Sequence, residues 1–218
     1  QALQEVDLPL VVLVGGATGT GKSTITTEVA HRLGITRVTS TDFVRQTMRA
    51  FFSEDFMPSI HYSSFEAGRA VETHANDRRD ANLRGFLDQT RNVLVGVHAV
   101  IDRALTEKHS MALEGVHLVP GSVPRELHGA IVSQCLIAIS DENEHARHFY
   151  VRDVDSEGLR PVHKYLNALP DIRKIQDHLI TRAHEAGVPV IENSDREEAV
   201  DAVIQLVLDA FDRAVVAA

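Results

Sequence analysis

The sequence predicts an α/β fold in which helices cover both faces of a five-stranded parallel sheet, a doubly wound arrangement. Short apolar runs alternate with longer amphipathic segments along the chain, which is the order expected of strands and helices in such a fold. Each connection between two apolar runs is long enough to cross over the sheet, as parallel pairing requires. The composition is typical of a folded protein, with 44% hydrophobic and 24% charged residues.

The length of 218 residues favours one domain, and we expect residues 1–218 to form it without an independent second domain. The expected strands are 10–14, 37–40, 111–116, 134–140 and 188–192. The expected helices are 22–33, 42–51, 65–75, 82–107, 143–154, 170–186 and 196–216. Residues 53–64 and 155–163 are expected to be loops.

Local signals support several of these elements. Residues 10–14 form a continuous apolar run, as in a parallel strand that is buried on both faces. Gly34 follows the first helix, where a glycine commonly ends it, and Asp42 stands where it would cap the second. Cys135, the single cysteine, lies in the apolar run of the fourth strand. We interpret it as a buried core residue rather than a nucleophile.

The charge balance excludes some classes of partner. The formal net charge is −9, which disfavours an extended contact with nucleic acid. No apolar run approaches the ~20 residues that span a membrane, and no signal peptide is visible at the start of the sequence. We therefore expect a cytoplasmic protein without a membrane or nucleic-acid partner. The long helical segment 82–107 is a candidate homodimer interface.

A glycine-rich motif directly after the first strand carries the strongest functional signal. Residues 16–23 match the phosphate-binding P-loop, or Walker A motif, which is a glycine, four residues and then Gly-Lys-Ser. The glycines let backbone N–H groups approach phosphates, and the start of a helix adds a favourable dipole. Lys22 is expected at the β- and γ-phosphates and Ser23 at Mg²⁺. The predicted nucleotide-binding residues are Gly16, Ala17, Thr18, Gly19, Thr20, Gly21, Lys22, Ser23 and Thr24.

The P-loop by itself does not name a reaction, but other features narrow the choice. The chain has no Asn-Lys-x-Asp guanine signature, and its third strand ends in Leu113-Glu114-Gly115 rather than in the aspartate usual in motor ATPases. The compact layout resembles the nucleotide-kinase branch of the P-loop NTPases, in which a mobile helical lid carries arginines over the phosphates. We expect residues 141–165 to be lid-like and residues 53–80 to be a mobile segment on the acceptor side.

Two acidic residues are expected beside the phosphate loop. Asp42 follows the second strand and Glu114 ends the third, and ligands bind at the carboxyl ends of the strands in a doubly wound sheet. Each is a candidate base for the acceptor hydroxyl and a candidate Mg²⁺ ligand with Ser23, and the sequence does not divide the two roles. Asp42 has the alternative role of a plain helix cap, and Glu114 that of a surface carboxylate.

Basic residues suggest an anionic acceptor. Arg45 and Arg49 lie one turn apart on one helix face and are candidates to hold a carboxylate or phosphate; the alternative is a solvated helix face. His117 is a candidate acceptor contact or a structural histidine. In the segment 141–165 we expect an arginine to reach the triphosphate, and Arg147 and Arg152 are the catalytic candidates.

Longer stretches resemble the 2-phosphoglycerate kinase family. They are GGATGTGKST at 15–24, TSTDFVRQTMR at 39–49 and LEGVHLVPG at 113–121, with further similarity at 160–166, 172–176 and 188–193. The resemblance covers most of the chain, and the second and third blocks are far more specific than the P-loop. The family positions fall on Lys22, Ser23, Asp42, Arg45, Arg49, Glu114 and His117.

The resemblance implies a kinase that uses ATP and Mg²⁺ to phosphorylate 2-phosphoglycerate to 2,3-bisphosphoglycerate. The archaeal members carry a further cone-like region before the phosphate loop. Here the loop starts at residue 16, so we expect that region either to be absent or to have been removed. Two alternatives stay open. The acceptor is another small alcohol, such as a sugar-like, cyclitol or natural-product compound, or the protein is a regulator that binds ATP without transferring phosphate.

Overall fold

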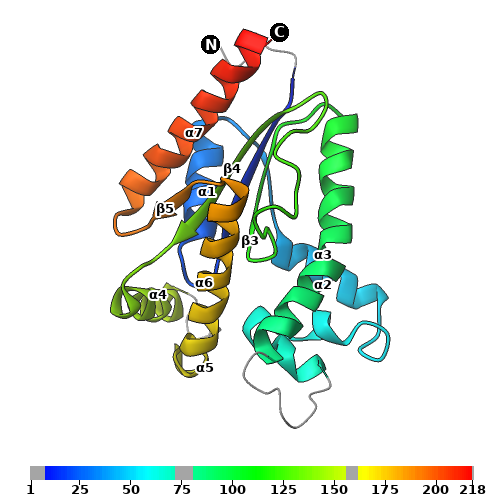
Figure 1. Cartoon of the computed structure of the whole chain (residues 1–218), viewed down its shortest axis with the longest axis vertical. Coiled ribbons are helices and arrows are strands. Elements are labelled where there is room, and N and C mark those ends of the chain that lie inside the picture. Colours follow the sequence, from blue (N-terminus) through cyan, green and yellow to red (C-terminus); the bar gives the residue numbers. More distant parts are fainter. Residues whose placement is uncertain (1–7, 72–80, 156–161, 218) are drawn as a thin grey trace.

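The computed structural model contains the predicted sheet, and it describes residues 8–71, 81–155 and 162–217 (Figure 1). The strands are β1 (Leu10–Gly16), β2 (Arg37–Ser40), β3 (Met111–Gly115), β4 (Ile131–Ala138) and β5 (Val190–Glu192). They lie in the order β2-β3-β1-β4-β5, and every neighbouring pair is parallel. The predicted doubly wound five-stranded sheet is therefore confirmed.

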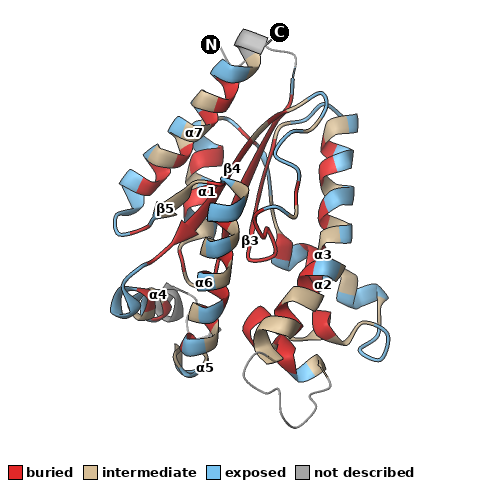
Figure 2. Ribbon diagram, in the orientation of Figure 1, coloured by how far each residue is buried: buried red, intermediate tan, exposed pale blue. Residues whose placement is uncertain are grey.

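The alternation of side chains along β1 divides the core into two layers. Val12 and Val14 pack with residues of α1 (Lys22–Arg32) and α7 (Arg196–Ala217) on one face. Val11 and Leu13 point to the opposite face and pack with α2 (Thr41–Phe51) and α3 (Ala81–Thr106). Because successive side chains of a strand point to opposite faces, a strand covered on both sides needs an unbroken apolar run. Figure 2 shows the resulting buried sheet between helices with exposed outer faces.

Three helices complete the far end of the molecule. They are α4 (Glu142–Asp155), α5 (Val162–Asn167) and α6 (Leu169–Ala186). A third apolar cluster joins Phe149 of α4 to Leu136 of β4 and Leu179 of α6. This cluster fixes α4 beside the phosphate loop, at the carboxyl ends of the strands (Figure 1).

The start of α2 differs from the prediction that Asp42 caps this helix. The helix begins at Thr41, and Ser40 is its cap. The Ser40 backbone is extended, and its hydroxyl oxygen accepts a hydrogen bond from the Phe43 N–H at 3.0 Å. The short Ser40 side chain can reach an N–H in the first turn from that position. Asp42 therefore lies inside the first turn, where its carboxylate is not used as the cap.

The segment between α2 and α3 is also built differently from the expected loop and α-helix. It holds two short 3₁₀ helices, η2 (Pro58–His61) and η3 (Ser64–Ala70). Gly85 of α3 packs directly on the backbone of Ala67 and Gly68, where a Cβ atom has no room. This close approach places η3 against the first turns of α3 (Figure 1).

Some expectations lie partly outside the described residues. Residues 72–80 of the segment 53–80, and residues 156–161 of the segment 141–165, belong to this group. The acceptor-side and lid-like roles of the two segments stay predictions, as does the single-domain assignment of residues 1–218.

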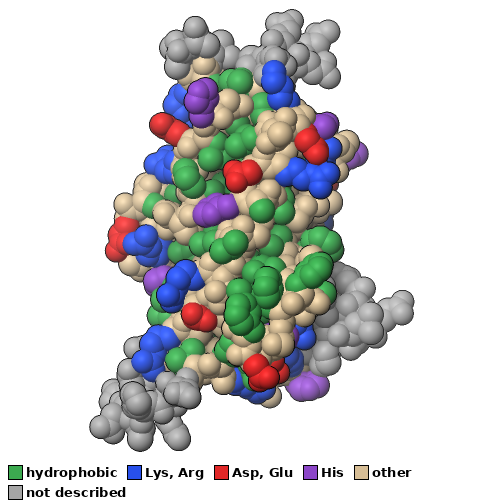
Figure 3. Space-filling view, turned by 90° about the vertical axis from the view of Figure 1, so that its right-hand side faces the viewer, with side chains coloured by type: hydrophobic (Ala, Val, Ile, Leu, Met, Phe, Trp, Pro, Cys, Tyr) green, Lys and Arg blue, Asp and Glu red, His purple; other side chains and the backbone are tan. Residues whose placement is uncertain are grey.

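The outer face of α3 carries scattered apolar side chains. Figure 3 shows this side of the molecule, where hydrophobic patches lie among separate charged groups. Val95 of α3 is 69% exposed. A homodimer interface on this helix stays a prediction. No helix in the described ranges combines the length and hydrophobicity that a membrane crossing needs.

Cys135 is buried in β4, as expected for a core residue, and burial raises the pKa of its thiol to about 12. The thiol is therefore protonated at neutral pH and is a poor nucleophile.

Candidate functional site

A cavity of about 340 Å³ opens at the carboxyl ends of β1, β2 and β3. One wall is formed by the phosphate loop and the first turn of α1, and another by α2 and η3. The residues lining the cavity are Thr18, Lys22, Ser23, Ser40, Thr41, Asp42, Arg45, Gln46, Ser63, Ser64, Phe65, Glu114, Gly115, Val116 and Tyr165. It therefore brings Lys22, Ser23, Asp42, Arg45 and Glu114 of the predicted site together.

The phosphate loop turns sharply between β1 and α1. Gly21 precedes the helix with a φ of 82°, a left-handed conformation that suits glycine. The ammonium group of Lys22 donates to the carbonyl of Ala17 at 3.1 Å, so the side chain folds back over the loop. A cationic group and a helix start at one loop form a site suited to phosphate.

Ser23 and Glu114 lie side by side at the next position. The Ser23 hydroxyl donates to Glu114 Oε1 at 2.9 Å, across 91 residues of sequence. Glu114 is 8% exposed and lies opposite Ser40 of β2 in the sheet register. A hydroxyl and a carboxylate provide the hard oxygen ligands that Mg²⁺ prefers, with water and phosphate oxygens completing the coordination. Within the described residues, no three His, Cys, Asp or Glu gather as a metal-binding group.

Asp42 lies on the other side of the cavity and pairs with Arg45. Asp42 Oδ1 accepts from Arg45 Nε at 3.0 Å and from Nη2 at 2.8 Å. The Asp42 side chain is 66% exposed, whereas that of Arg45 is 6% exposed. Arg45 Nη1 also donates to the carbonyls of Ile60 at 2.7 Å and Tyr62 at 2.9 Å. Arg45 therefore fixes both Asp42 and the backbone of η2.

His117 lies beneath the cavity in a closed hydrogen-bond network and is 1% exposed. Gln89 Nε2 donates to the carbonyls of Ser59 and Tyr62, so Gln89 Oε1 faces His117 as an acceptor. His117 Nε2 therefore carries the proton, and Nδ1 accepts from the Thr41 hydroxyl at 2.8 Å. Burial, and secondarily the charge of Arg45, lowers the pKa of His117 to about 3. This geometry favours the structural role that the sequence left open.

Other predicted residues lie away from the cavity lining. Arg49 is exposed, and its Nη1 donates to Gln46 at 3.0 Å. Arg147 is also exposed and forms an ion pair with Glu144 of its own helix. Arg152 falls in α4, but its side chain lies outside the described part of the structure. The substrate-binding role of Arg49 and the catalytic roles of Arg147 and Arg152 stay predictions.

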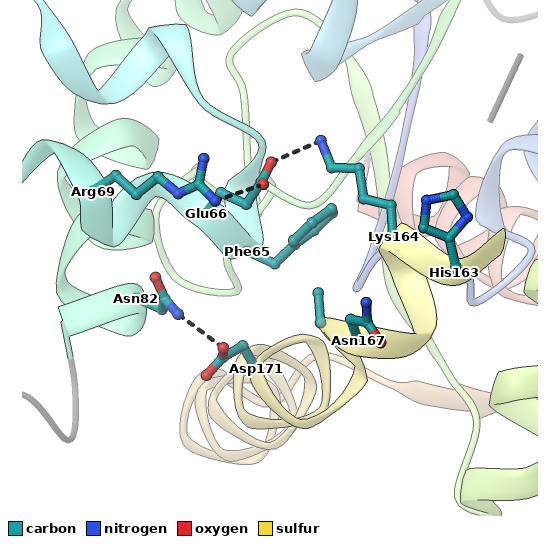
Figure 4. A pocket seen from close by; sticks show the side chains of 9 residues that line it. Phe65, Glu66, Arg69, Asn82, His163, Lys164, Asn167 and Asp171 are labelled. Atoms are coloured by element: carbon teal, nitrogen blue, oxygen red, sulfur yellow. Dashed lines mark hydrogen bonds and ion pairs between the residues drawn. The ribbon is translucent and has the colours of Figure 1, made fainter. Parts of the chain in front are cut away.

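A second cavity, of about 500 Å³, lies between η3 and α3 on one side and α5 and α6 on the other (Figure 4). Glu66 Oε2 accepts from Lys164 at 2.8 Å, and Asn82 Nδ2 donates to Asp171 Oδ2 at 2.8 Å. Phe65 lines this cavity and also the first one. The two contacts therefore join η3 to α5 and α3 to α6.

Sequence reasoning missed several residues that shape the site. Gln89 lies in the middle of a long helix, and no local pattern distinguishes it from a surface amide. Ser63 and Ser64 stood in an expected loop, where serines are common. His145 and His148 fall within the expected helix 143–154. Their i and i+3 spacing on an expected helix was the one available signal that they share a face.

Comparison with known proteins finds several similar proteins that share one name. The 2-phosphoglycerate kinase of Methanothermobacter thermautotrophicus is 41% identical to this chain over 198 residues, 90% of this chain and 65% of the relative. That of Thermococcus kodakarensis is 43% identical over 196 residues, 89% of this chain and 65% of the relative. Over about nine-tenths of its length, this chain is therefore similar to the 2-phosphoglycerate kinase family.

The chain spans 65% of the length of these two members of the 2-phosphoglycerate kinase family. The member from Methanopyrus kandleri is 38% identical over 200 residues, 91% of this chain and 61% of the relative. No protein-family model matches the chain.

Solved structures support the fold. A shikimate kinase from Acinetobacter baumannii, in complex with shikimate, matches with a TM-score of 0.53 and 17% identity and covers 96% of this chain and 98% of its own. A protein of Thermus thermophilus matches with a TM-score of 0.52 and 19% identity over 93% of this chain and 97% of its own. Identities this low support a shared fold alone.

Proposed function

We propose that the protein transfers the γ-phosphate of ATP to the 3-hydroxyl of 2-phosphoglycerate, giving 2,3-bisphosphoglycerate and ADP. One observation carries the proposal: a single cavity is lined by Lys22 and Ser23 of the phosphate loop and by Asp42, Arg45 and Glu114. We choose 2-phosphoglycerate as the acceptor because the similar proteins are named 2-phosphoglycerate kinases.

The nucleotide has room on the opposite side of the phosphate loop. A further cavity of about 440 Å³ is lined there by Gly19, Gly21, Lys22, Ser23, Thr24, His148, Val151, Asn193, Ser194 and Arg196. Lys22 and Ser23 line both cavities. We place the adenosine part of ATP in this cavity and its γ-phosphate at the border between the two.

Ser23 and Glu114 are the residues that we assign to Mg²⁺, since their oxygens lie together beside the loop. When bound with ATP, Mg²⁺ neutralises charge on the β- and γ-phosphate oxygens. Lys22 adds a cationic group at the same oxygens. This divides the roles that the sequence left open, with Glu114 on the metal side and Asp42 on the acceptor side.

Asp42 is the candidate base. Both Arg45 hydrogen bonds fall on Oδ1, and no bond to Oδ2 occurs within the described residues. We propose that Oδ2 takes the proton of the acceptor hydroxyl as the hydroxyl oxygen bonds to the γ-phosphorus. The bond from that phosphorus to the β–γ bridging oxygen breaks in the same step, and ADP leaves with the negative charge.

An anionic acceptor fits the opposite wall of the cavity. Four of the five N–H groups of Arg45 have partners among the described residues, which leaves one hydrogen on Nη2. Ser63 and Ser64 line the same cavity. We assign these donors to the carboxylate or phosphate of the acceptor, because charged acceptors strengthen such hydrogen bonds.

The test is an ADP-release assay with Mg-ATP that compares 2-phosphoglycerate with 3-phosphoglycerate, glycerate, cyclitols and sugar phosphates. We expect strong turnover with 2-phosphoglycerate alone, and mass spectrometry of the product should show a bisphosphorylated glycerate. Turnover with a different alcohol would replace the acceptor and keep the kinase. ATP binding without turnover on any acceptor would favour a regulator that only binds ATP.

A further inference from the structure

Three consecutive carbonyls of the phosphate loop each accept a hydrogen bond from a side chain outside the loop. His145 Nε2 lies 2.8 Å from the carbonyl of Thr18, and His148 Nδ1 lies 3.0 Å from that of Gly19. Asn193 Nδ2 donates to the carbonyl of Thr20 at 2.9 Å. The histidines come from α4, and Asn193 follows β5, so two distant parts of the chain hold one loop.

The carbonyl partners determine which nitrogen of each ring carries its proton. A carbonyl only accepts, so Nε2 must be protonated in His145 and Nδ1 in His148. His145 Nδ1 is buried without a hydrogen-bond partner. Burial lowers the pKa of His145, although the Thr18 carbonyl opposes that shift. His145 is therefore a neutral donor whose single proton is committed to the loop.

The His145 ring is itself held in place. Phe149 is buried and stacks on His145, with ring centroids 5.5 Å apart, and on Tyr165, with centroids 5.1 Å apart. A Cβ atom on Gly19 would lie 2.5 Å from the Phe149 ring, and one on Gly21 would overlap the Asn193 amide. The loop thus lies directly against these side chains, and only glycine allows that approach.

The orientation of a carbonyl fixes the N–H of the next residue. In a planar trans peptide the C=O and the N–H point in opposite directions. Carbonyls of Thr18, Gly19 and Thr20 held outward therefore turn the following N–H groups towards the inside of the loop. The Thr20 N–H already points at the Ala17 carbonyl inside the loop, at a long distance of 3.5 Å. A phosphate oxygen would be a stronger acceptor for it.

We propose that His145, His148 and Asn193 are positioning residues that hold the phosphate loop in its anion-binding form before the nucleotide arrives. The inference rests on the proposed binding of a nucleotide at this loop. Preorganised donors raise affinity because the ligand does not have to order them. All three side chains hydrogen-bond the loop backbone, but His148 and Asn193 also line the cavity in which we place the adenosine, so His145 is the residue that tests the effect of the loop alone.

Substitution of each histidine by glutamine and by asparagine tests the proposal, because the amide nitrogens of the two residues imitate different ring nitrogens of histidine. The Nε2 of glutamine can replace His145 Nε2, and the Nδ2 of asparagine can replace His148 Nδ1. We expect His145→Gln and His148→Asn to bind Mg-ADP within about threefold of the unaltered protein. We expect His145→Asn and His148→Gln to lose roughly five- to tenfold in affinity, as one lost hydrogen bond would cause.

The measurement is isothermal titration calorimetry of the full chain with Mg-ADP, alongside thermal unfolding of each variant. His98 is exposed on α3, and its two amide variants are the matched controls. The proposal predicts a crossover, in which glutamine binds Mg-ADP more tightly than asparagine at position 145 and asparagine more tightly than glutamine at position 148. This crossover, with equal melting temperatures within each pair, supports the proposal. Equal affinities within each pair, or affinity losses that follow melting temperature alone, would overturn it, as would absence of Mg-ADP binding by the unaltered protein.

This experiment needs no acceptor, so it separates the inference from the proposed reaction. The crossover together with no phosphorylation of 2-phosphoglycerate would retain the inference and remove the reaction. Turnover of 2-phosphoglycerate without the crossover would do the reverse. Hydrogen exchange of the loop amides in the absence of nucleotide adds a second readout, with faster exchange expected in His145→Asn than in His145→Gln.

Discussion

The phosphate side and the acceptor side of the cavity are built in different ways. The phosphate side is a continuous run of backbone between β1 and α1, and its glycines set its shape. The acceptor side is assembled from α2, η2, η3 and α3 through the side chains of Arg45 and Gln89. A backbone site leaves a motif in the sequence. A site made of distant side chains leaves none that a single sequence reveals.

Both sides nevertheless use one device, in which side-chain donors capture the carbonyls of a loop. Two histidines and an amide hold the phosphate loop, namely His145, His148 and Asn193. On the acceptor side, one of the two donors is the buried charge of Arg45. Loss of a buried charged donor is costly, so we expect changes on the acceptor side to affect stability more and changes in the loop to affect phosphate transfer more.

The largest effect is expected for Lys22→Ala. It removes the cation that folds over the phosphate loop, and we expect transfer to fall roughly 1,000-fold or more. The side chain is only partly buried, so the fold should persist. Steady-state kinetics with circular dichroism checks both parts. Transfer at an unchanged rate in a folded Lys22→Ala protein would rule out the P-loop mechanism.

The next largest effect separates the two carboxylates. Glu114→Gln should lower kcat by roughly 100-fold and shift the Mg²⁺ concentration for half-maximal activity upward. Asp42→Asn should lower kcat by a similar factor without that shift, since we place Asp42 at the acceptor hydroxyl. A Mg²⁺ titration of both variants gives the answer. A shift in Asp42→Asn alone would exchange the two assignments.

Arg45 and Arg49 provide a matched pair on one helix. Arg45→Ala removes donors from the carbonyls of Ile60 and Tyr62 and from Asp42, so unfolding should need about 3 kcal/mol less free energy. The same variant should raise the KM of the acceptor far more than that of ATP. Arg49→Ala should change stability by no more than about 0.5 kcal/mol.

Urea unfolding and two-substrate kinetics measure the pair. Equal changes in unfolding free energy and in acceptor KM would show that burial of Arg45 against η2 has no effect. They would contradict the role that we assign to Arg45.

The smallest effect concerns pH. His117 stays neutral in the fold, where its pKa is about 3, whereas its ordinary pKa, expected in the unfolded chain, is 6.5. Between pH 6.5 and 3 the unfolded state binds the extra proton, so stability should fall as pH falls, by about 1.4 kcal/mol per unit at most. Above pH 6.5 neither state is protonated, and the contribution is constant.

Urea unfolding between pH 7 and 5 of the unaltered protein and of His117→Gln checks this slope. The variant should be less stable at pH 7 and should show a flatter decline. An identical decline in both proteins would assign the pH dependence to other groups.

Much of the fold was accessible from the sequence because its signals are local. Three elements were predicted from neighbouring residues only. They are the strand at 10–14, the strand β2 at 37–40, and the end of the first helix at Gly34, which has a φ of 70°. The boundaries that differed depend on contacts. Ser40 rather than Asp42 caps α2, and the segment after η2 is a 3₁₀ helix packed on α3, since Gly85 and Gly68 allow the close approach.

The sequence by itself determined the phosphate loop and the placement of Asp42 and Glu114 at one cavity. A contiguous motif is readable in one chain, and parallel strands bring their carboxyl ends to one edge. Only the tertiary structure decided that Arg45 is buried while Arg49, one turn away, is exposed, and that His145 and His148 face the loop. The physical reason is that burial and hydrogen-bond partners come from elements far away in sequence, such as η2 for Arg45 and the phosphate loop for α4.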